Sequence, residues 1–110
     1  MKTMIRITVY QDQDGRYTGF DCSGHADYAE SGSDIVCAGV SALVITAVNA
    51  VGELTEEKFT SESDQEEGSI RFRMRSFGHD SQLLLQAMVL GLEEMENSYG
   101  KWIDLIFEEV

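Results

Sequence analysis

The most constraining feature of this 110-residue chain is a stretch without charge that runs for eighteen residues, from Ile35 to Gly52. A stretch of that length is long enough to cross a bilayer, so a membrane segment has to be weighed first. The stretch is rich in Ala, Gly, Ser, Thr and Asn rather than Leu and Phe, and its acidic flanks, Asp34 and Glu53, offer no Lys or Arg anchors. We therefore expect a helix buried in protein and no membrane partner.

The residues before this helix predict a β-hairpin. Residues 4–10, "MIRITVY", alternate apolar and polar side chains, and an Asp-Gly turn leads into the second strand, "RYTGFDCSG" (16–24). A loop of small and polar residues follows, with Gly32 as its pivot. Ser33 or Asp34 is a suitable N-cap for a helix from Ile35 to about Gly52, where glycine supplies the stop.

The residues after the helix predict two more strands, a second helix and a last strand. The strands are "EKFTSES" (57–63) and "SIRFRMRSF" (69–77), and in the second of them arginines alternate with apolar residues. The arginine row indicates a solvated sheet face or, alternatively, a binding stripe. Asp80 is placed to cap a helix over residues 81–99 that Gly100 closes, and "KWIDLIFEEV" (101–110) ends as a strand.

These elements predict an α/β (α+β) fold in one domain, residues 1–110. The order β-β-α-β-β-α-β favours a layered architecture, with one sheet packed against two helices. The uncharged helix is apolar nearly all round, so one sheet cannot cover it. The second helix or a second subunit must cover the rest, and we expect a homodimer.

The net charge of the chain limits the classes of molecule that it is expected to bind. Eight Lys and Arg against twenty Asp and Glu give a formal net charge of −12, which disfavours direct binding of nucleic acid. The same surface would attract a basic partner, although acidity also serves solubility alone. The N-terminal pattern is that of a strand and lacks the apolar core of a secretion signal, so we expect a cytoplasmic protein. In that compartment Cys22 and Cys37 stay as thiols rather than forming a structural disulfide.

Cys37 and His25 are the candidate catalytic residues. With Asp34 as N-cap, Cys37 lies in the first helical turn, where unpaired N–H groups and the helix dipole favour a thiolate. His25, at a strand end, can fold back across the loop to act as a base. Asp34 would cap the helix or orient His25, and Ser41, one turn after Cys37, would either offer a hydroxyl to substrate or serve packing.

Two other interpretations remain for these residues. Cys37 can be a buried small hydrophobe and His25 an ordinary turn histidine. Alternatively, Cys22, His25 and Cys37 can be zinc ligands, a site that would need His79 as its fourth ligand.

The segment that holds these residues resembles a known family. "GHA" (24–26) followed by a short loop and "GSDIVCAGVSAL" (32–43) is similar to the ribosomal-processing cysteine proteases of bacteria. The likeness covers nearly the whole length of the chain, and the motif positions match without departure. The strands and helices outside the motif are only loosely similar.

The resemblance implies a homodimeric cytoplasmic peptidase with a Cys–His dyad and no metal or cofactor. Carried over by position, Cys37 is the nucleophile and His25 is the residue that donates and accepts the proton. The implied reaction removes a short N-terminal extension from the large-subunit ribosomal protein numbered twenty-seven, with cleavage after an aromatic residue. The loop then becomes a gate over the substrate cleft, formed by Ala26, Asp27, Tyr28, Ala29, Glu30, Ser31, Gly32 and Ser33.

A function of another class stays open beside the protease. The chain can instead be a non-catalytic, ribosome-associated binding module that holds a basic protein tail at the helix start and the loop. That alternative predicts that a Cys37→Ala variant functions normally, whereas the protease predicts that it is inactive.

Overall fold

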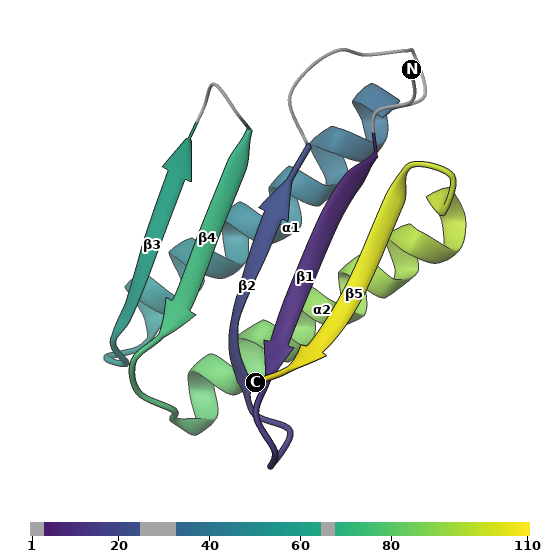
Figure 1. The fold of residues 1–110 in the computed structure, drawn as a ribbon. Coiled ribbons are helices and arrows are strands. Elements are labelled where there is room, and N and C mark those ends of the chain that lie inside the picture. Colours follow the sequence, from purple (N-terminus) through teal and green to yellow (C-terminus); the bar gives the residue numbers. More distant parts are fainter. Residues whose placement is uncertain (1–3, 25–32, 65–67) are drawn as a thin grey trace.

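The computed structural model describes residues 4–24, 33–64 and 68–110, and of Ser33 and Asp34 it describes the backbone only. These residues form five strands and two helices in the predicted order (Figure 1). The elements are β1 (Ile5–Gln11), β2 (Tyr17–Ser23), α1 (Ser33–Leu54), β3 (Phe59–Asp64), β4 (Ser69–Met74), α2 (His79–Tyr99) and β5 (Ile103–Glu109).

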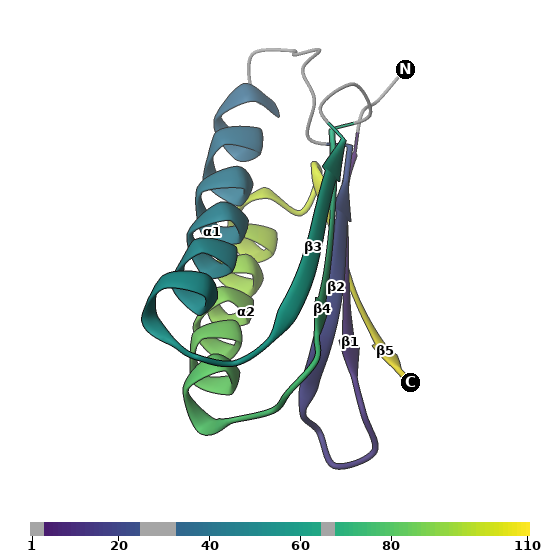
Figure 2. The ribbon, with the colours of Figure 1, turned by 90° about the vertical axis from the view of Figure 1, so that its left-hand side faces the viewer.

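The five strands form one sheet in the order β3-β4-β2-β1-β5. Strands β1, β2, β4 and β3 pair antiparallel with their neighbours, whereas β5 pairs parallel with β1. Both helices lie on the same face of the sheet, and no helix of the described residues lies on the opposite face (Figure 2). The predicted class of a sheet packed against two helices is confirmed, as a two-layer α+β fold.

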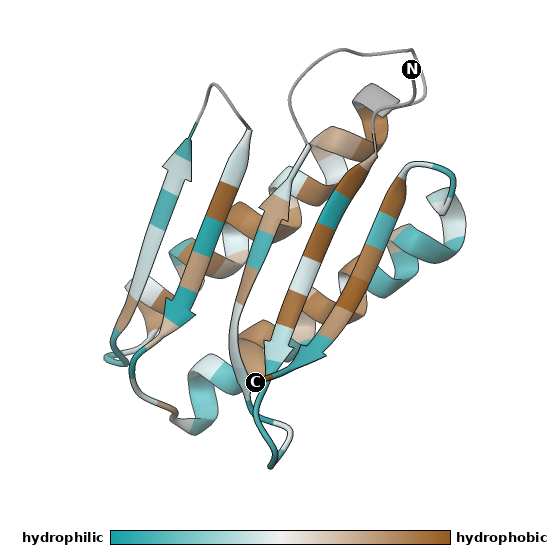
Figure 3. Cartoon of the chain, viewed as in Figure 1, coloured by the Kyte–Doolittle hydropathy of each residue, from teal (hydrophilic) through white to brown (hydrophobic). Residues whose placement is uncertain are grey.

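Alternation along the strands builds the inner half of the core. Ile5, Ile7 and Val9 of β1 are buried, and the residues between them are more exposed, so Figure 3 shows hydrophobic and hydrophilic positions alternating along this strand. The helices supply the other half from one stripe of each, which in α1 consists of Val36, Val40, Val44, Ala47 and Val51. Each fully buried valine contributes about 1.5–3 kcal/mol relative to an exposed one.

Glycines let the two helices pack closely. A Cβ atom at Gly39 of α1 would lie 2.7 Å from Cε of Met95, and one at Gly91 of α2 would lie 2.7 Å from Cδ2 of Leu43. Both separations are shorter than carbon atoms tolerate, so a larger residue at either position would displace the side chain opposite. The two glycines thus allow the backbones of α1 and α2 to approach closely where the helices contact each other.

Both helices begin earlier than the sequence predicted. Helix α1 begins at Ser33 and ends at Leu54, so Asp34 lies inside its first turn and Gly52 does not stop it. Ser and Asp are well tolerated in a first helical turn as well as at the N-cap, which makes a sequence boundary uncertain by a residue or two. Helix α2 begins at His79 with Gly78 as its N-cap, so Asp80 lies in the first turn and is not the cap.

The start of α2 is capped by a residue from another element. The Glu57 carboxylate accepts hydrogen bonds from the N–H groups of Gly78 and Ser81 and from the Ser81 hydroxyl. Desolvation acts to raise the pKa of Glu57, but these hydrogen bonds outweigh it, and the pKa lies below its ordinary value. A side chain twenty-one positions earlier therefore does what the prediction assigned to Asp80.

The bare face of the sheet holds a polar cluster instead of a free row of arginines. Arg73 donates a 2.8 Å hydrogen bond to Asp21, whose carboxylate also accepts one of 2.8 Å from the Tyr10 hydroxyl. The guanidinium lies 4.7 Å from the centre of the Tyr10 ring. Arg71 remains exposed and lies 3.8 Å from Asp21. The solvated-face interpretation therefore fits Arg71, whereas Arg73 serves the sheet itself.

Candidate active site

Cys37 lies near the start of α1, half-buried and packed against the core. It is the fifth residue of the helix and so opens the second turn, two residues later than the third position that the sequence predicted. The N–H groups that lack a partner within a helix belong to its first four residues, which here are residues 33–36. Because Cα–Cβ bonds tilt toward the N-terminus of a helix, a side chain at the second turn leans back toward those groups. The thiol therefore lies two residues further from the helix start than predicted, and the stabilisation of a thiolate there stays a prediction.

Cys22 has a different setting on the inner face of β2. Its side chain is only 1% exposed and belongs to the hydrophobic core. Burial raises the pKa of this thiol to about 12, and the nearby charge of Cys37 adds to the rise. The two thiols therefore lie near enough for one charge to affect the other thiol, and neither forms a disulfide.

The end of β2 sets the direction in which the chain leaves toward His25. Gly24 has a positive φ of 83°, and a Cβ atom there would lie 2.5 Å from the carbonyl oxygen of Met4. Only glycine combines that conformation with that close approach. His25 and the gate residues 26–32 lie outside the described residues, so the dyad and the gate stay predictions. The described ends on either side, Gly24 and Ser33, lie at the same end of the molecule (Figure 1).

The two supporting residues lie on α1 as their spacing predicted. The backbone of Asp34 is in the first turn, three residues before Cys37, while its side chain lies outside the described atoms. Ser41 is one turn after Cys37 and is half-buried on the same flank of the helix. The roles of both residues remain predictions.

The zinc alternative loses its fourth ligand. His79 is the first residue of α2, and that helix starts at the opposite end of the molecule from the start of α1 (Figure 1). His79 therefore cannot join Cys37 at one metal ion. Among the residues with described positions, no group of three or more His, Cys, Asp or Glu side chains is arranged to hold a metal.

A groove that the sequence analysis missed lies on the flank of α1 that faces β3. This α1–β3 groove has a volume of about 280 Å³, and its lining includes Ile45, Val48, Ser61, Glu62, Ser63 and Ile70. Its signal in the sequence is the pair of serines in "FTSESD", at positions where the strand pattern calls for core residues. The serines indicate a groove only when β3 is known to be the edge strand beside α1, and that position cannot be predicted from local sequence.

Comparison with known proteins gives this arrangement a context. The family described as cysteine protease Prp matches residues 4–104. A Staphylococcus aureus protein named ribosomal processing cysteine protease Prp is 36% identical over 106 residues, which cover 96% of this chain and 100% of that protein.

Solved structures agree with the sequence match. The crystal structure of an essential ribosomal processing protease Prp from S. aureus in complex with a substrate peptide has a TM-score of 0.90 and 35% identity, and the match covers 96% of this chain and 100% of that one. A structure of the S. aureus protease with a covalently linked product peptide has a TM-score of 0.86 and 36% identity, with the same coverage. Family, relative and fold agree over nearly the full chain, and the chain therefore belongs to the Prp family of cysteine proteases.

Proposed function

We propose that this protein removes an N-terminal extension from a large-subunit ribosomal protein, with Cys37 as nucleophile and His25 as its proton-transfer partner. The observation that carries the proposal is the place of Cys37: a half-buried thiol near a helix start, at the end of the molecule where β2 leads into His25. The relatives' names, and the S. aureus structures with a substrate peptide and with a covalently linked product, support the same reaction.

The proposed chemistry is acyl transfer in two steps. The Cys37 thiolate attacks the carbonyl carbon of the scissile peptide, and backbone N–H groups at the start of α1 stabilise the oxyanion. The C–N bond then breaks as His25 donates its proton to the leaving amine, which leaves a thioester on Cys37. Water, deprotonated by His25, hydrolyses the thioester and restores the thiol. No external electron donor or cofactor enters this balance.

The proposed substrate and compartment follow from charge and from the N-terminal pattern. A ribosomal protein binds RNA phosphates and is basic, which suits an enzyme with a net charge of −12. The same charge argues against direct contact with nucleic acid, and we place the enzyme in the cytoplasm, where ribosomes are assembled.

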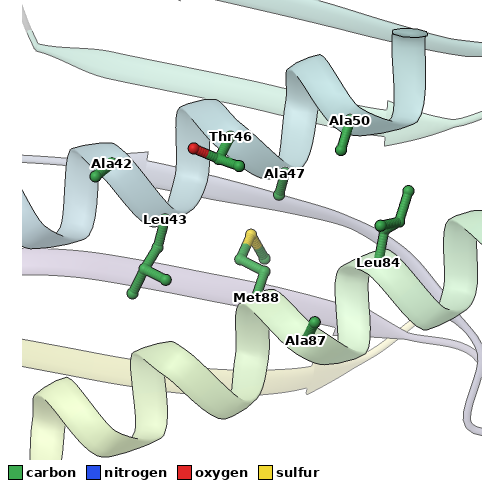
Figure 4. A pocket seen from close by; sticks show the side chains of 8 residues that line it. All are labelled: Ala42, Leu43, Thr46, Ala47, Ala50, Leu84, Ala87 and Met88. Atoms are coloured by element: carbon green, nitrogen blue, oxygen red, sulfur yellow. The ribbon is translucent and has the colours of Figure 1, made fainter. Parts of the chain in front are cut away.

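A homodimer completes the proposal, because the helix layer leaves apolar surface uncovered. The length and composition of helix α1 would allow it to cross a membrane. Only 28% of its most apolar eighteen-residue stretch, within Ile35–Leu54, is buried by the rest of the described chain. A groove of about 320 Å³ runs between the helices, and its lining is small or apolar: Ala42, Leu43, Thr46, Ala47, Ala50, Leu84, Ala87 and Met88 (Figure 4). Leu83 and Leu90 of α2 are 55% and 60% exposed. A second copy that seats its own helices on this face would cover it without a membrane.

The dimer is tested by a matched pair of substitutions. Thr46→Arg places a charge in the groove between the helices, whereas Thr60→Arg places the same charge on the exposed strand β3. Light scattering at micromolar concentration should give a dimer mass for the wild type and for Thr60→Arg, and a monomer mass for Thr46→Arg. A monomeric wild type would reject the dimer.

The protease is tested by cleavage of a peptide with an aromatic residue before the scissile bond. Cys37→Ala should abolish cleavage, whereas Cys22→Ala should retain it, since Cys22 is buried in the core. An alanine in place of the aromatic residue should slow cleavage strongly. Normal activity of Cys37→Ala would favour the binding module instead.

A further inference from the structure

The α1–β3 groove lies on the same flank of α1 as Cys37. Cys37, Ser41 and Ile45 follow one another at four-residue spacing along one side of the helix, and Ile45 is part of the groove lining. At 1.5 Å per residue, Ile45 is about 12 Å from Cys37 along the helix axis. An extended peptide advances about 3.3 Å per residue, so a substrate that lies along this flank reaches the groove three or four residues from the scissile bond.

The groove exists because β3 contributes little to the core. β3 is an edge strand paired only with β4, and all but the first of its residues are exposed. Ser61 stands opposite Phe72, which is buried under the helices, and Ser63 stands opposite Ile70. Both serines therefore lie on the inner face of the sheet. Their short side chains leave the space beside α1 unfilled, and Ile45 is 47% exposed as a result.

The groove is uncharged on both of its walls. On α1, the stretch from Ile35 to Gly52 holds no charged residue. On β3, Glu62 and Asp64 border the groove, but they alternate with the serines, so their carboxylates belong to the outer face of the sheet. Glu62 stands there opposite Arg71. A charged side chain that entered the groove would lose water and find no opposite charge on these walls, which is costly.

The remaining lining suits one apolar side chain of an extended peptide. Ile45, Val48 and Ile70 present aliphatic surface. Ser63 and Asn49 bring a hydroxyl and an amide, which are groups that hydrogen-bond the main chain of a peptide. The volume of about 280 Å³ falls just below the roughly 300–1,000 Å³ of small-molecule pockets. The groove is therefore of a size for a single large side chain rather than for a whole ligand.

We propose that the α1–β3 groove is a specificity subsite that binds one leucine or isoleucine side chain of the substrate, three or four residues from the scissile bond. The proposal rests on the proposed function. An aliphatic side chain that is exposed in the free peptide becomes buried in the groove, and this burial adds binding free energy away from the reacting atoms. Salt does not screen such binding, whereas it weakens the attraction between an acidic enzyme and a basic substrate.

A leucine scan of the substrate tests the subsite. The reference peptide has an aromatic residue before the scissile bond and asparagine at the third and fourth positions on both sides of it. Four further peptides each replace one of these asparagines by leucine, which has a similar size and no polar end. We expect a leucine on one side of the bond to raise kcat/KM about tenfold, mainly through KM and equally at low and high salt. Equal cleavage of all five peptides would overturn the subsite.

A matched pair of substitutions on β3 ties the preference to the groove. Ser63→Phe places a ring on the inner face of the strand, and Thr60→Phe, opposite Arg73, places the same ring on the outer face. Ser63→Phe should remove the preference for leucine, and Thr60→Phe should keep it. If Ser63→Phe does not fold, Ile45→Asn carries the test, because it removes aliphatic surface from an exposed position. A preference that survives in the groove variant, or that Thr60→Phe also removes, would reject the subsite.

The failure of the proposed function has a different signature. If the wild type cleaves none of the peptides, the protease assignment fails and not the groove. Binding of the peptides to Cys37→Ala, measured by fluorescence anisotropy, still tests the groove in that case. Tighter binding of a leucine peptide that Ser63→Phe abolishes supports the subsite, and equal binding of all five peptides contradicts it.

Discussion

The inner face of β2 and the second turn of α1 each hold a cysteine, and the two thiols are near enough for the charge of one to affect the other. Cys22 is enclosed by the core and is 1% exposed, whereas Cys37 is half-buried at the edge of the same core. Their difference therefore arises from position. A strand interior offers a thiol no N–H donors and no water, while a helix start offers both.

This contrast shows that a nucleophilic thiol is better placed at the edge of the hydrophobic core, where water reaches it, than inside the core. Ionisation of a thiol becomes costly when water is removed, and Cys22 shows this cost in its raised pKa. Cys37 is held by the same packed layer, because it contacts the core on one side, yet it keeps access on the other. The core thus fixes the position of the reactive group without enclosing it.

The largest expected effect is a difference in alkylation rate between the two cysteines. With limiting iodoacetamide at about pH 8, a thiol whose pKa is about 12 is thiolate in roughly one molecule in ten thousand. Cys37 should react at least about a hundredfold faster than Cys22 in the native protein, as measured by peptide mapping of the labelled chain. In urea the two should react at similar rates. Preferential labelling of Cys22 in the native protein would break the comparison.

The second effect is a loss of stability in alkali that depends on Cys22. Its folded pKa of about 12 lies above the ordinary value of 9.0, so the unfolded state loses its proton first. The stabilisation is fully present below about pH 9 and declines as the pH rises toward 12. Between pH 9 and 11 the free energy of unfolding should fall by about 2 kcal/mol more in the wild type than in Cys22→Val. Urea titrations that stay parallel across this range would contradict the burial of the thiol.

The smallest effect concerns the residue beside Cys22 on the other face of β2. Desolvation acts to raise the pKa of Asp21, but hydrogen bonds from Arg73 and Tyr10 and the charges of Arg73 and Arg71 outweigh it, so the folded pKa is depressed. The resulting stability is present above about pH 4 and is lost as the pH falls through the folded pKa. Because the side chain is 33% exposed, Asp21→Asn should cost less than about 1 kcal/mol at neutral pH.

The free energy of unfolding at acidic pH provides the control for the prediction on Asp21. As the pH falls below about 4, the unfolding curves of the wild type and of Asp21→Asn should converge, since the wild-type carboxyl becomes neutral as well. Asp104→Asn, which removes an exposed partner of Arg6, should have a smaller effect at every pH. A constant gap between wild type and Asp21→Asn would show that the carboxylate acts through shape rather than charge.

Local patterns in the sequence predicted most of the fold. The alternation of Ile5, Ile7 and Val9 was enough to identify β1 and its buried face, and the uncharged run identified α1. The order of the strands was not predicted, because no local pattern shows that β5 pairs parallel with β1. The prediction that Asp80 caps α2 was wrong for a related reason: the helix start is capped by Glu57, which lies twenty-one positions before Gly78.

The candidate site was predicted in part. The motif around Cys37 identified the family, and the spacing of Cys37 and Ser41 placed them on one flank of α1. Two relations depended on tertiary structure and could not be read from spacing: the closeness of Cys22 to Cys37, and the groove that the serines of β3 leave beside Ile45. Both arise where α1 packs back against the strands next to it in sequence, and the angle of that packing has no signal in residue spacing.

The parallel pairing of β1 with β5 has a consequence for the time at which the protein can fold. Ile5 pairs with Ile103, so the first strand leaves the ribosome about a hundred residues before its partner. Until then β1 has only β2 beside it, and α2 lacks the edge strand against which it packs. Pairings so distant in sequence form late and slowly, because the conformational entropy of the long connecting chain is lost before the stabilising contacts between the strands can form. During synthesis, the edge of β1 is therefore exposed to mispairing for almost the whole of translation.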